Sequence, residues 1–309
     1  MRRASLPNLA TLKTGDKREI ARALAAIETE SGSDALAALL DAACAQARAY
    51  VIGLTGPPGV GKSTLTNTIV SRARARGETV GVIAVDPSSR RTGGALLGDR
   101  ARIATDPDDA GVFVRSMAAR DRLGGLSNET VAAMVLMRAI YDCVLIESVG
   151  IGQSEADILF VADTVLLCVQ PGSGDSLQFM KAGVTELPDI VAVTKADMEA
   201  ARRTRADVEG ALTLYSEGRR APVVLVGAAR GEGLDELDTA LADHRAWLME
   251  DKRLVQKRHG QENLWVEQAI RARFGSIGLR VMRKGKPHIG GPFAREQAIS
   301  KELLTRLGF

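Results

Sequence analysis

Seven short apolar runs, many of them rich in valine and isoleucine, recur between residues 50 and 228. In chain order they are YVIGLTG, TVGVIAVD, GVFVRS, DCVLIES, TVLLCVQ, DIVAVTK and PVVLVGA. These runs lack a regular alternation of apolar and polar residues, which is typical of strands buried on both faces of a parallel sheet. Longer segments with helical spacing separate the runs and can form the right-handed crossovers that parallel strands require. The pattern predicts an α/β core with a mainly parallel sheet flanked by helices.

Helical patterns lie on both sides of this core. Before Tyr50, apolar residues recur at steps of three and four, with a break at residues 31–33, and predict two amphipathic helices. After Trp247, charged helical sequence leads into the basic segment KGKPHIGGPF and a last short helix. We expect an N-terminal helical extension over 1–48, the core domain over 49–246, and over 247–309 a C-terminal helical extension that is a candidate dimerisation element.

Composition narrows the class of protein. Hydrophobic residues make up 45% and charged residues 26% of the chain, which is ordinary for a water-soluble protein. The 41 basic and 38 acidic side chains leave a net charge of only +3, which gives no reason to expect a nucleic-acid partner. The arginines near the start are not followed by the apolar run of a secretory signal, and no run of about 18 apolar residues occurs. We expect a cytoplasmic protein that binds neither nucleic acid nor membrane.

The cysteines and histidines do not suggest a transition-metal site. Cys44, Cys143 and Cys168 lack the paired spacing of a zinc site or a disulfide framework. We therefore expect buried, reduced, structural thiols. The three histidines are scattered along the chain and form no metal-binding tract.

The run GPPGVGKST matches the phosphate-loop pattern G-x-x-x-x-G-K-[ST], with a predicted strand before it and a helix after it. Its glycines let successive backbone N–H groups surround the α- and β-phosphates beside a helix N-terminus. Lys62 is expected to reach the β- and γ-phosphates, and the Ser63 hydroxyl to bind Mg²⁺. The pattern predicts a P-loop nucleoside triphosphatase. The expected nucleotide-binding residues in this run are Gly56, Pro57, Pro58, Gly59, Val60, Gly61, Lys62, Ser63 and Thr64.

Two acidic residues, Asp86 and Glu147, end predicted strands at the edge where open α/β sheets bind ligands. A buried carboxylate without a cation is costly, so acids in this position favour a metal-binding role, directly or through water. Together with Lys62 they are the expected catalytic residues.

The polar segments that follow these two strands have the composition of nucleotide-dependent switches. The first, DPSSRRTGGALLGDR, contains Asp99 and can be ordered by the γ-phosphate and released on hydrolysis. The second begins after Glu147, where Gly150 is placed for a backbone contact with the γ-phosphate. Gln153 lies in the next run, IGQSEAD, and is a candidate for positioning the attacking water.

The run IVAVTKAD resembles the N-K-x-D motif that recognises guanine in G proteins, with Thr194 in place of asparagine. Asp197 can accept hydrogen bonds from guanine N1–H and from the exocyclic amine, which adenine cannot offer, while the Lys195 stem covers the base. The later run VGAARGEG resembles the second base-binding loop, which acts mainly through backbone N–H groups. We expect Gly227, Ala228 and Ala229 to bind the base there, with GTP as substrate and GDP as product.

Together the runs GPPGVGKST, AVDPSSRRTGGALLGDR, YDCVLIESVGIGQSEAD, PGSGDSLQFMKAG and TKAD resemble the MeaB/ArgK family of G-protein chaperones for adenosylcobalamin-dependent acyl-CoA mutases. The resemblance covers roughly residues 50–245. It implies a SIMIBI-class P-loop GTPase that docks on a mutase, gates adenosylcobalamin delivery, and protects or reactivates that enzyme. We also expect a homodimer.

The resemblance assigns roles to individual residues. Ser63, Asp86, Asp99 and Glu147 match the positions that surround Mg²⁺ in the family. The run PGSGDSLQFMKAG matches the family's third switch, in which Gln178 and Lys181 are expected to signal to the partner.

Two other functions use the same fold. A P-loop kinase would phosphorylate a small molecule or a transport protein, but a guanine-reading aspartate gives an ATP-dependent kinase no advantage. A metal-insertion GTPase would carry a His-rich tract or a Cys/His pair near its switches, and this sequence has neither. Phosphate found on an acceptor, rather than released, would favour the kinase.

Overall fold

The computed structural model describes residues 6–30, 32–86, 103, 106, 108–118, 126–148, 157–172, 188–215, 219–285 and 288–306. The chain forms two compact units. The sheet unit contains Tyr50–Ser127 and Cys143–Leu254, and the helical unit contains Met1–Ala49, Asn128–Asp142 and Val255–Phe309.

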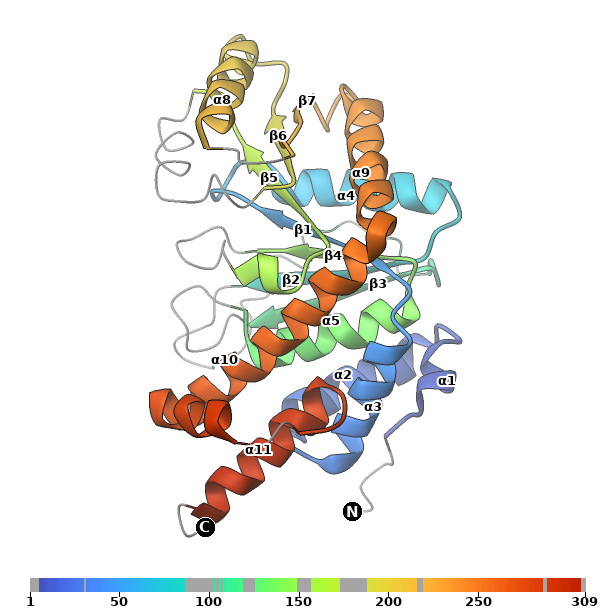
Figure 1. Cartoon of the computed structure of the whole chain (residues 1–309). Helices are drawn as coiled ribbons and strands as arrows, with labels where there is room; N and C mark the ends of the chain where they lie inside the picture. The colour runs from blue at the N-terminus through green and yellow to red at the C-terminus, as the bar shows by residue number, and fades with distance from the viewer. Residues whose placement is uncertain are drawn as a thin grey trace. The chain divides into compact units, whose positions relative to one another are not determined.

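The sheet unit is built on a seven-stranded sheet in which every neighbouring pair is parallel (Figure 1). Its strands are β1 Tyr50–Thr55, β2 Val80–Asp86, β3 Val112–Ala118, β4 Cys143–Glu147, β5 Thr164–Val169, β6 Ile190–Thr194 and β7 Val223–Val226. They lie in the order β3-β2-β4-β1-β5-β6-β7. Each of the seven apolar runs forms one strand, so the predicted α/β architecture is confirmed.

The strand register brings the carboxyl ends of β1, β2 and β4 together. Glu147, the last residue of β4, lies opposite Leu54 of β1 on one side and Ala84 of β2 on the other. Since all strands are parallel, their carboxyl ends meet at one edge of the sheet. The loop after β1 and the end of β2 therefore lie at the same edge as Glu147.

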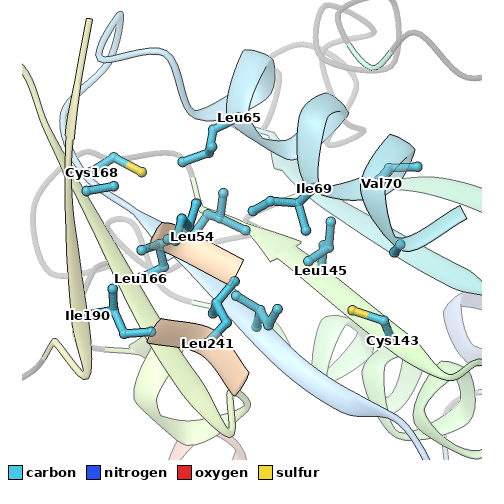
Figure 2. Close-up of a cluster of buried hydrophobic side chains, with 14 of the residues drawn as sticks. Leu54, Leu65, Ile69, Val70, Cys143, Leu145, Leu166, Cys168, Ile190 and Leu241 are labelled. Atoms are coloured by element: carbon cyan, nitrogen blue, oxygen red, sulfur yellow. The ribbon is translucent and has the colours of Figure 1, made fainter. Parts of the chain in front are cut away.

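Helices α4 Lys62–Ala75, α8 Ala201–Tyr215 and α9 Leu234–Met249 complete the core of the sheet unit, with short 3₁₀ turns η1 Ile158–Phe160 and η3 Glu250–Lys252. Figure 2 shows Leu65 and Ile69 of α4 and Leu241 of α9 around Leu54 and Leu166 of the sheet. Helix α8 packs in a second cluster with the alternate residues of β5 and β6, such as Leu167 and Val191. Alternation along the strands thus fills a separate cluster on each face.

The helical unit is formed by α1 Leu9–Leu12, α2 Lys17–Thr29, α3 Asp34–Ala45, α5 Asn128–Ile140, most of α10 Arg253–Lys284, and α11 Pro292–Arg306. Asp16 caps α2 and Ser33 caps α3, which confirms the two amphipathic helices expected before Tyr50. Helix α3 contacts both α5 and α11. The Asp41 carboxylate on α3 accepts the backbone N–H groups of Phe293 and Ala294 at 3.0 Å each, so the first and last parts of the chain join here.

The cysteines are free thiols, and Cys143 and Cys168 are buried as expected, whereas Cys44 is partly exposed. In the part of the chain that the structure describes, no helix has both the length and the apolar character needed to span a bilayer.

Candidate functional site

The loop between β1 and α4 has the backbone shape of a phosphate cradle. Gly56, Gly59 and Gly61 have φ angles of 137°, 76° and 102°, which side chains rarely tolerate. A Cβ atom at Gly56 would collide with the carbonyl oxygen of Cys168, whereas one at Gly59 or Gly61 would meet no atom within 4 Å. The first glycine therefore permits close packing on β5, and the other two leave open space beside the N-terminus of α4.

Lys62 lies beneath this loop and is only 7% exposed. Its Nζ donates to the carbonyl oxygens of Gly56 at 2.7 Å and Pro57 at 3.0 Å. The carbonyl oxygens of the first two loop residues thus hold the ammonium group. Burial raises the pKa of the neighbouring Cys168 thiol to about 12, although the Lys62 charge opposes this shift.

Glu147 connects the end of β4 to the start of α4. The Ser63 hydroxyl donates to Glu147 Oε1 at 2.7 Å, and the Thr66 hydroxyl donates to Oε2 at 3.0 Å. Glu147 is 5% exposed, and Asp86 at the end of the adjacent strand β2 is 1% exposed. Two buried acids and a serine hydroxyl thus lie at the edge of the sheet next to the cradle, and such hard oxygen donors suit Mg²⁺.

Thr194 ties the cradle to the strands beside it. Its hydroxyl lies 2.7 Å from the carbonyl oxygen of Val60 and 3.0 Å from that of Val169, and can donate to either. A hydroxyl has a single proton, so the two acceptors share one donor. The threonine at this position therefore links the glycine loop, β5 and β6.

Lys195 follows in a left-handed conformation with a φ of 51°. Its exposed Nζ donates to the carbonyl oxygen of Gly59 at 3.2 Å and to Gln170 Oε1 at 2.7 Å. The side chain therefore runs from the end of β6 toward the glycine loop, with Gln170 fixing its tip.

Asp197 completes this end of the site and faces the loop after β7. Its Oδ2 lies 3.4 Å from Nη2 of Arg230. The loop at 227–232 is closed by two backbone hydrogen bonds between Gly227 and Glu232, at 3.0 and 3.2 Å. The arrangement can present a carboxylate and backbone N–H groups to one flat ligand.

A family model described as "Methylmalonyl Co-A mutase-associated GTPase MeaB" matches residues 20–277. The chain belongs to the MeaB family of GTPases. It hydrolyses GTP.

Relatives support the same assignment for this MeaB-family GTPase. A protein of Pyrococcus horikoshii described as a GTPase is 43% identical over 254 residues, which cover 80% of each chain. GTPase ArgK of Escherichia coli is 34% identical over 269 residues, covering 83% of this chain and 81% of the relative. The mouse protein named "Methylmalonic aciduria type A homolog, mitochondrial" is 36% identical over 228 residues, 72% of this chain and 55% of the relative.

Solved structures agree on the architecture. The crystal structure of a protein described as "LAO/AO transport system kinase" has a TM-score of 0.68 and 25% identity, covering 96% of both chains. HypB from Helicobacter pylori in complex with nickel has a TM-score of 0.51 and 19% identity, covering 68% of this chain and 94% of that one. At that identity the second match shows the fold alone.

The structure brings many of the predicted residues together around the cradle. Glu147 contacts it through Ser63, and Asp86 ends the neighbouring strand β2. Thr194 and Lys195 contact it at Val60 and Gly59, and Asp197 faces Arg230 of the loop that contains Gly227, Ala228 and Ala229. The remaining predicted residues lie outside the described residues and are Asp99, Gly150, Gln153, Gln178 and Lys181.

Sequence reasoning missed three residues of this site. Thr66 donates to Glu147, Gln170 accepts from Lys195, and Arg230 faces Asp197. A sequence signal for Thr66 existed, because it lies about one helical turn after Ser63 and therefore on the same face of the helix that begins at the cradle. The contacts of Gln170 and Arg230 depend on the pairing of β6 with β5 and with β7, for which the sequence carries no local signal.

Proposed function

We propose that this GTPase uses its nucleotide cycle to gate adenosylcobalamin delivery to an acyl-CoA mutase and to protect or reactivate that enzyme. The observation that carries the proposal is the match over residues 20–277 to a family described as methylmalonyl Co-A mutase-associated. The mouse relative, named for methylmalonic aciduria, supports the same class of partner.

The proposed chemistry is in-line attack of water on the γ-phosphate. The Lys62 side chain would turn from the Gly56 and Pro57 carbonyls toward the phosphates. There its ammonium group would neutralise the negative charge that moves onto the β/γ-bridging oxygen during hydrolysis. Backbone N–H groups of the cradle, which spans Gly56 to Thr64 and in which Pro57 and Pro58 have no N–H, would hold the α- and β-phosphates. Gln153 remains the proposed water-positioning residue, and Gly150 the proposed γ-phosphate contact.

Mg²⁺ is the proposed metal, and the donor set fits it. Ser63, Asp86 and Glu147 supply oxygen atoms, and Asp99 is the proposed fourth residue. Within the described residues, no three His, Cys, Asp or Glu side chains gather to hold a metal ion. Mg²⁺ completes its shell with phosphate oxygens and water, so each of these carboxylates would approach the ion directly or through water. The ion would offset phosphate charge.

For the base, we propose that Asp197 accepts from guanine N1–H and the exocyclic amine, with Lys195 over the ring. The fixed position of Lys195 Nζ between Gly59 and Gln170 supports this role. Thr194 would act through its link to the cradle, and Gly227, Ala228 and Ala229 would contact the base edge through backbone N–H groups. Asp197 would thereby exclude adenine nucleotides.

Communication with the mutase is assigned to Gln178 and Lys181. We also propose a homodimer formed through the C-terminal extension. Val255, Leu264 and Ile277 on α10 are exposed large apolar side chains, which support an interface on this helix. A cytoplasmic location stays a prediction.

The test is a reconstitution with purified components. The GTPase is incubated with Mg²⁺ and either GTP or ATP, with and without a cobalamin-dependent acyl-CoA mutase, and free phosphate and mutase activity are followed. We expect GTP-specific phosphate release that the mutase accelerates, and slower inactivation of the mutase. If GTP turnover proceeds but no acyl-CoA mutase changes it, the partner assignment is wrong.

One competing activity has a specific observation in its favour, because the solved structure that covers 96% of this chain is described as a transport system kinase. The same assay tests it. Phosphate appearing on an added acceptor protein or small molecule, with ATP as donor, would replace the GTPase-chaperone proposal with a kinase. A metal-insertion role would instead require specific binding of a transition metal.

A further inference from the structure

The carboxylate assigned to guanine recognition already has a cationic neighbour from another loop. Arg230 Nη2 lies 3.4 Å from Asp197 Oδ2, with Arg230 64% and Asp197 40% exposed. Both residues follow strands that are paired with each other, since Thr194 of β6 lies opposite Val226 of β7. The contact is therefore a feature of two adjacent loops at one end of the site.

The backbone that carries Arg230 is fixed on both sides. Two hydrogen bonds join Gly227 to Glu232, and the N–H of Arg230 donates to the Gly227 carbonyl oxygen at 2.8 Å. Gly233 has a φ of 68°, and a Cβ there would collide with the Leu225 carbonyl oxygen, so the chain must turn at this point.

The backbone that carries Asp197 is held as well. The N–H of Ala196 donates to the Val226 carbonyl oxygen at 3.3 Å, and the N–H of Met198 donates to that of Lys195 at 3.0 Å. The two loops therefore hold their Cα atoms in place, and the long, exposed Arg230 side chain is the part that can move.

Guanine and arginine offer the same hydrogen-bonding edge to a carboxylate. Each presents parallel N–H donors attached to one guanidine-type carbon, which fit the two oxygens of a carboxylate. When guanine donates N1–H and its exocyclic amine to Asp197, it uses the oxygen that Arg230 now faces. We propose that Arg230 is an internal competitor for guanine: it pairs with Asp197 whenever no base is bound there, and it must move away when the nucleotide binds.

The exposure of the pair limits how strong this competition is. Solvent-exposed ion pairs contribute little, and the upper end of their range corresponds to about a fivefold change in an equilibrium constant. Arg230 therefore tunes nucleotide affinity without blocking the site. By returning to Asp197 as the base leaves, it accelerates GDP release and favours exchange. This role rests on the proposed assignment of Asp197 to guanine.

The test compares Arg230→Ala with Arg203→Ala, which removes an equally charged, exposed arginine from α8. Affinity and dissociation rate are measured with a fluorescent GDP at low and at high salt. We expect Arg230→Ala to bind GDP about two- to fivefold more tightly and to release it more slowly, with Arg203→Ala equal to wild type. The ratio between wild type and Arg230→Ala should shrink at about 1 M salt, because salt screens an exposed pair. Arg230→Lys retains the charge but lacks the guanidinium edge, so its GDP affinity should lie between those of wild type and Arg230→Ala.

Weaker GDP binding by Arg230→Ala would overturn the proposal, because it would make Arg230 a direct contact of the nucleotide. Unchanged binding would overturn it too. An Asp197→Ala variant separates this failure from failure of the guanine site. If Asp197→Ala loses the preference for GDP over ADP while Arg230→Ala behaves as wild type, the guanine site stands and the competitor does not. If Asp197→Ala keeps the preference, both assignments fall.

Discussion

The phosphate end and the base end of the site both place a lysine ammonium beside the glycine loop, but in very different surroundings. Lys62 is 7% exposed and donates to Gly56 and Pro57 carbonyls, whereas Lys195 is exposed and donates to Gly59 and Gln170. Charges removed from water are costly unless they are compensated, and a polyphosphate with its metal compensates them well. The buried end should therefore supply most of the affinity, and the exposed end should select the base.

The largest expected effect is that of Lys62→Ala. If this buried charge contacts the phosphates as proposed, its loss should weaken GTP binding by about 100-fold, from the usual strength of hydrogen bonds to charged groups. Calorimetry with GTP and Mg²⁺ measures this, and thermal unfolding shows whether the fold is intact. GTP binding close to that of wild type would show that the phosphate end does not supply most of the affinity.

Thr194→Val tests the connection between the two ends. The change keeps the shape but removes the proton shared between the Val60 and Val169 carbonyl oxygens, so both buried acceptors lose their donor. We expect about tenfold weaker binding of both GTP and GDP. Thr194→Ser retains the hydroxyl and serves as the matched control. Equal affinities for the valine and serine variants would show that the link to the cradle is unimportant.

A smaller loss is expected from Lys195→Ala. The ammonium group is exposed, so its hydrogen bonds to Gly59 and Gln170 should be worth only about threefold in GDP affinity. Lys195→Met keeps the apolar stem that would cover guanine and should recover part of that loss. If Lys195→Ala lost as much nucleotide affinity as Lys62→Ala, the exposed base end would contribute as much to binding as the buried phosphate end.

The smallest expected effects concern the thiol of Cys168, which lies near Lys62 at the phosphate end: its alkylation and its contribution to the pH dependence of unfolding. Because burial raises the pKa of this thiol to about 12, the thiolate is rare near pH 8 and the folded protein should not be alkylated there. The unfolded thiol ionises near its ordinary pKa, so linkage lowers the free energy of unfolding as pH rises from about 9 toward 12. Mass spectrometry after a brief treatment with an alkylating reagent at about pH 8 checks the first point. Rapid labelling of Cys168 would mean that the phosphate end opens readily to water.

Local sequence was sufficient to predict the strands and the cradle because each depends on neighbouring residues. The run YVIGLTG became β1, and the glycines at 56, 59 and 61 adopt the positive φ angles that the phosphate-loop pattern implies. The sequence also placed Glu147 at the end of a strand, since a hydrophobic run leads directly to it.

The contacts of those residues required the fold. Whether Glu147 meets Ser63 depends on β4 lying beside β1, although the two residues are 84 positions apart in the chain. The facing of Arg230 and Asp197 depends on the pairing of β6 with β7. Exposed charges can pair with many partners, so no local pattern distinguishes this arginine from the others.

The junction of α3 with α11 has a consequence for biosynthesis. Asp41, near the start of the chain, accepts from Phe293 and Ala294, near its end. During translation the sheet unit has all of its residues once Leu254 has left the ribosome, whereas α3 must wait for the last helix to be made. Helix α3 therefore spends most of the synthesis of the chain without the backbone N–H groups that its Asp41 carboxylate finally accepts.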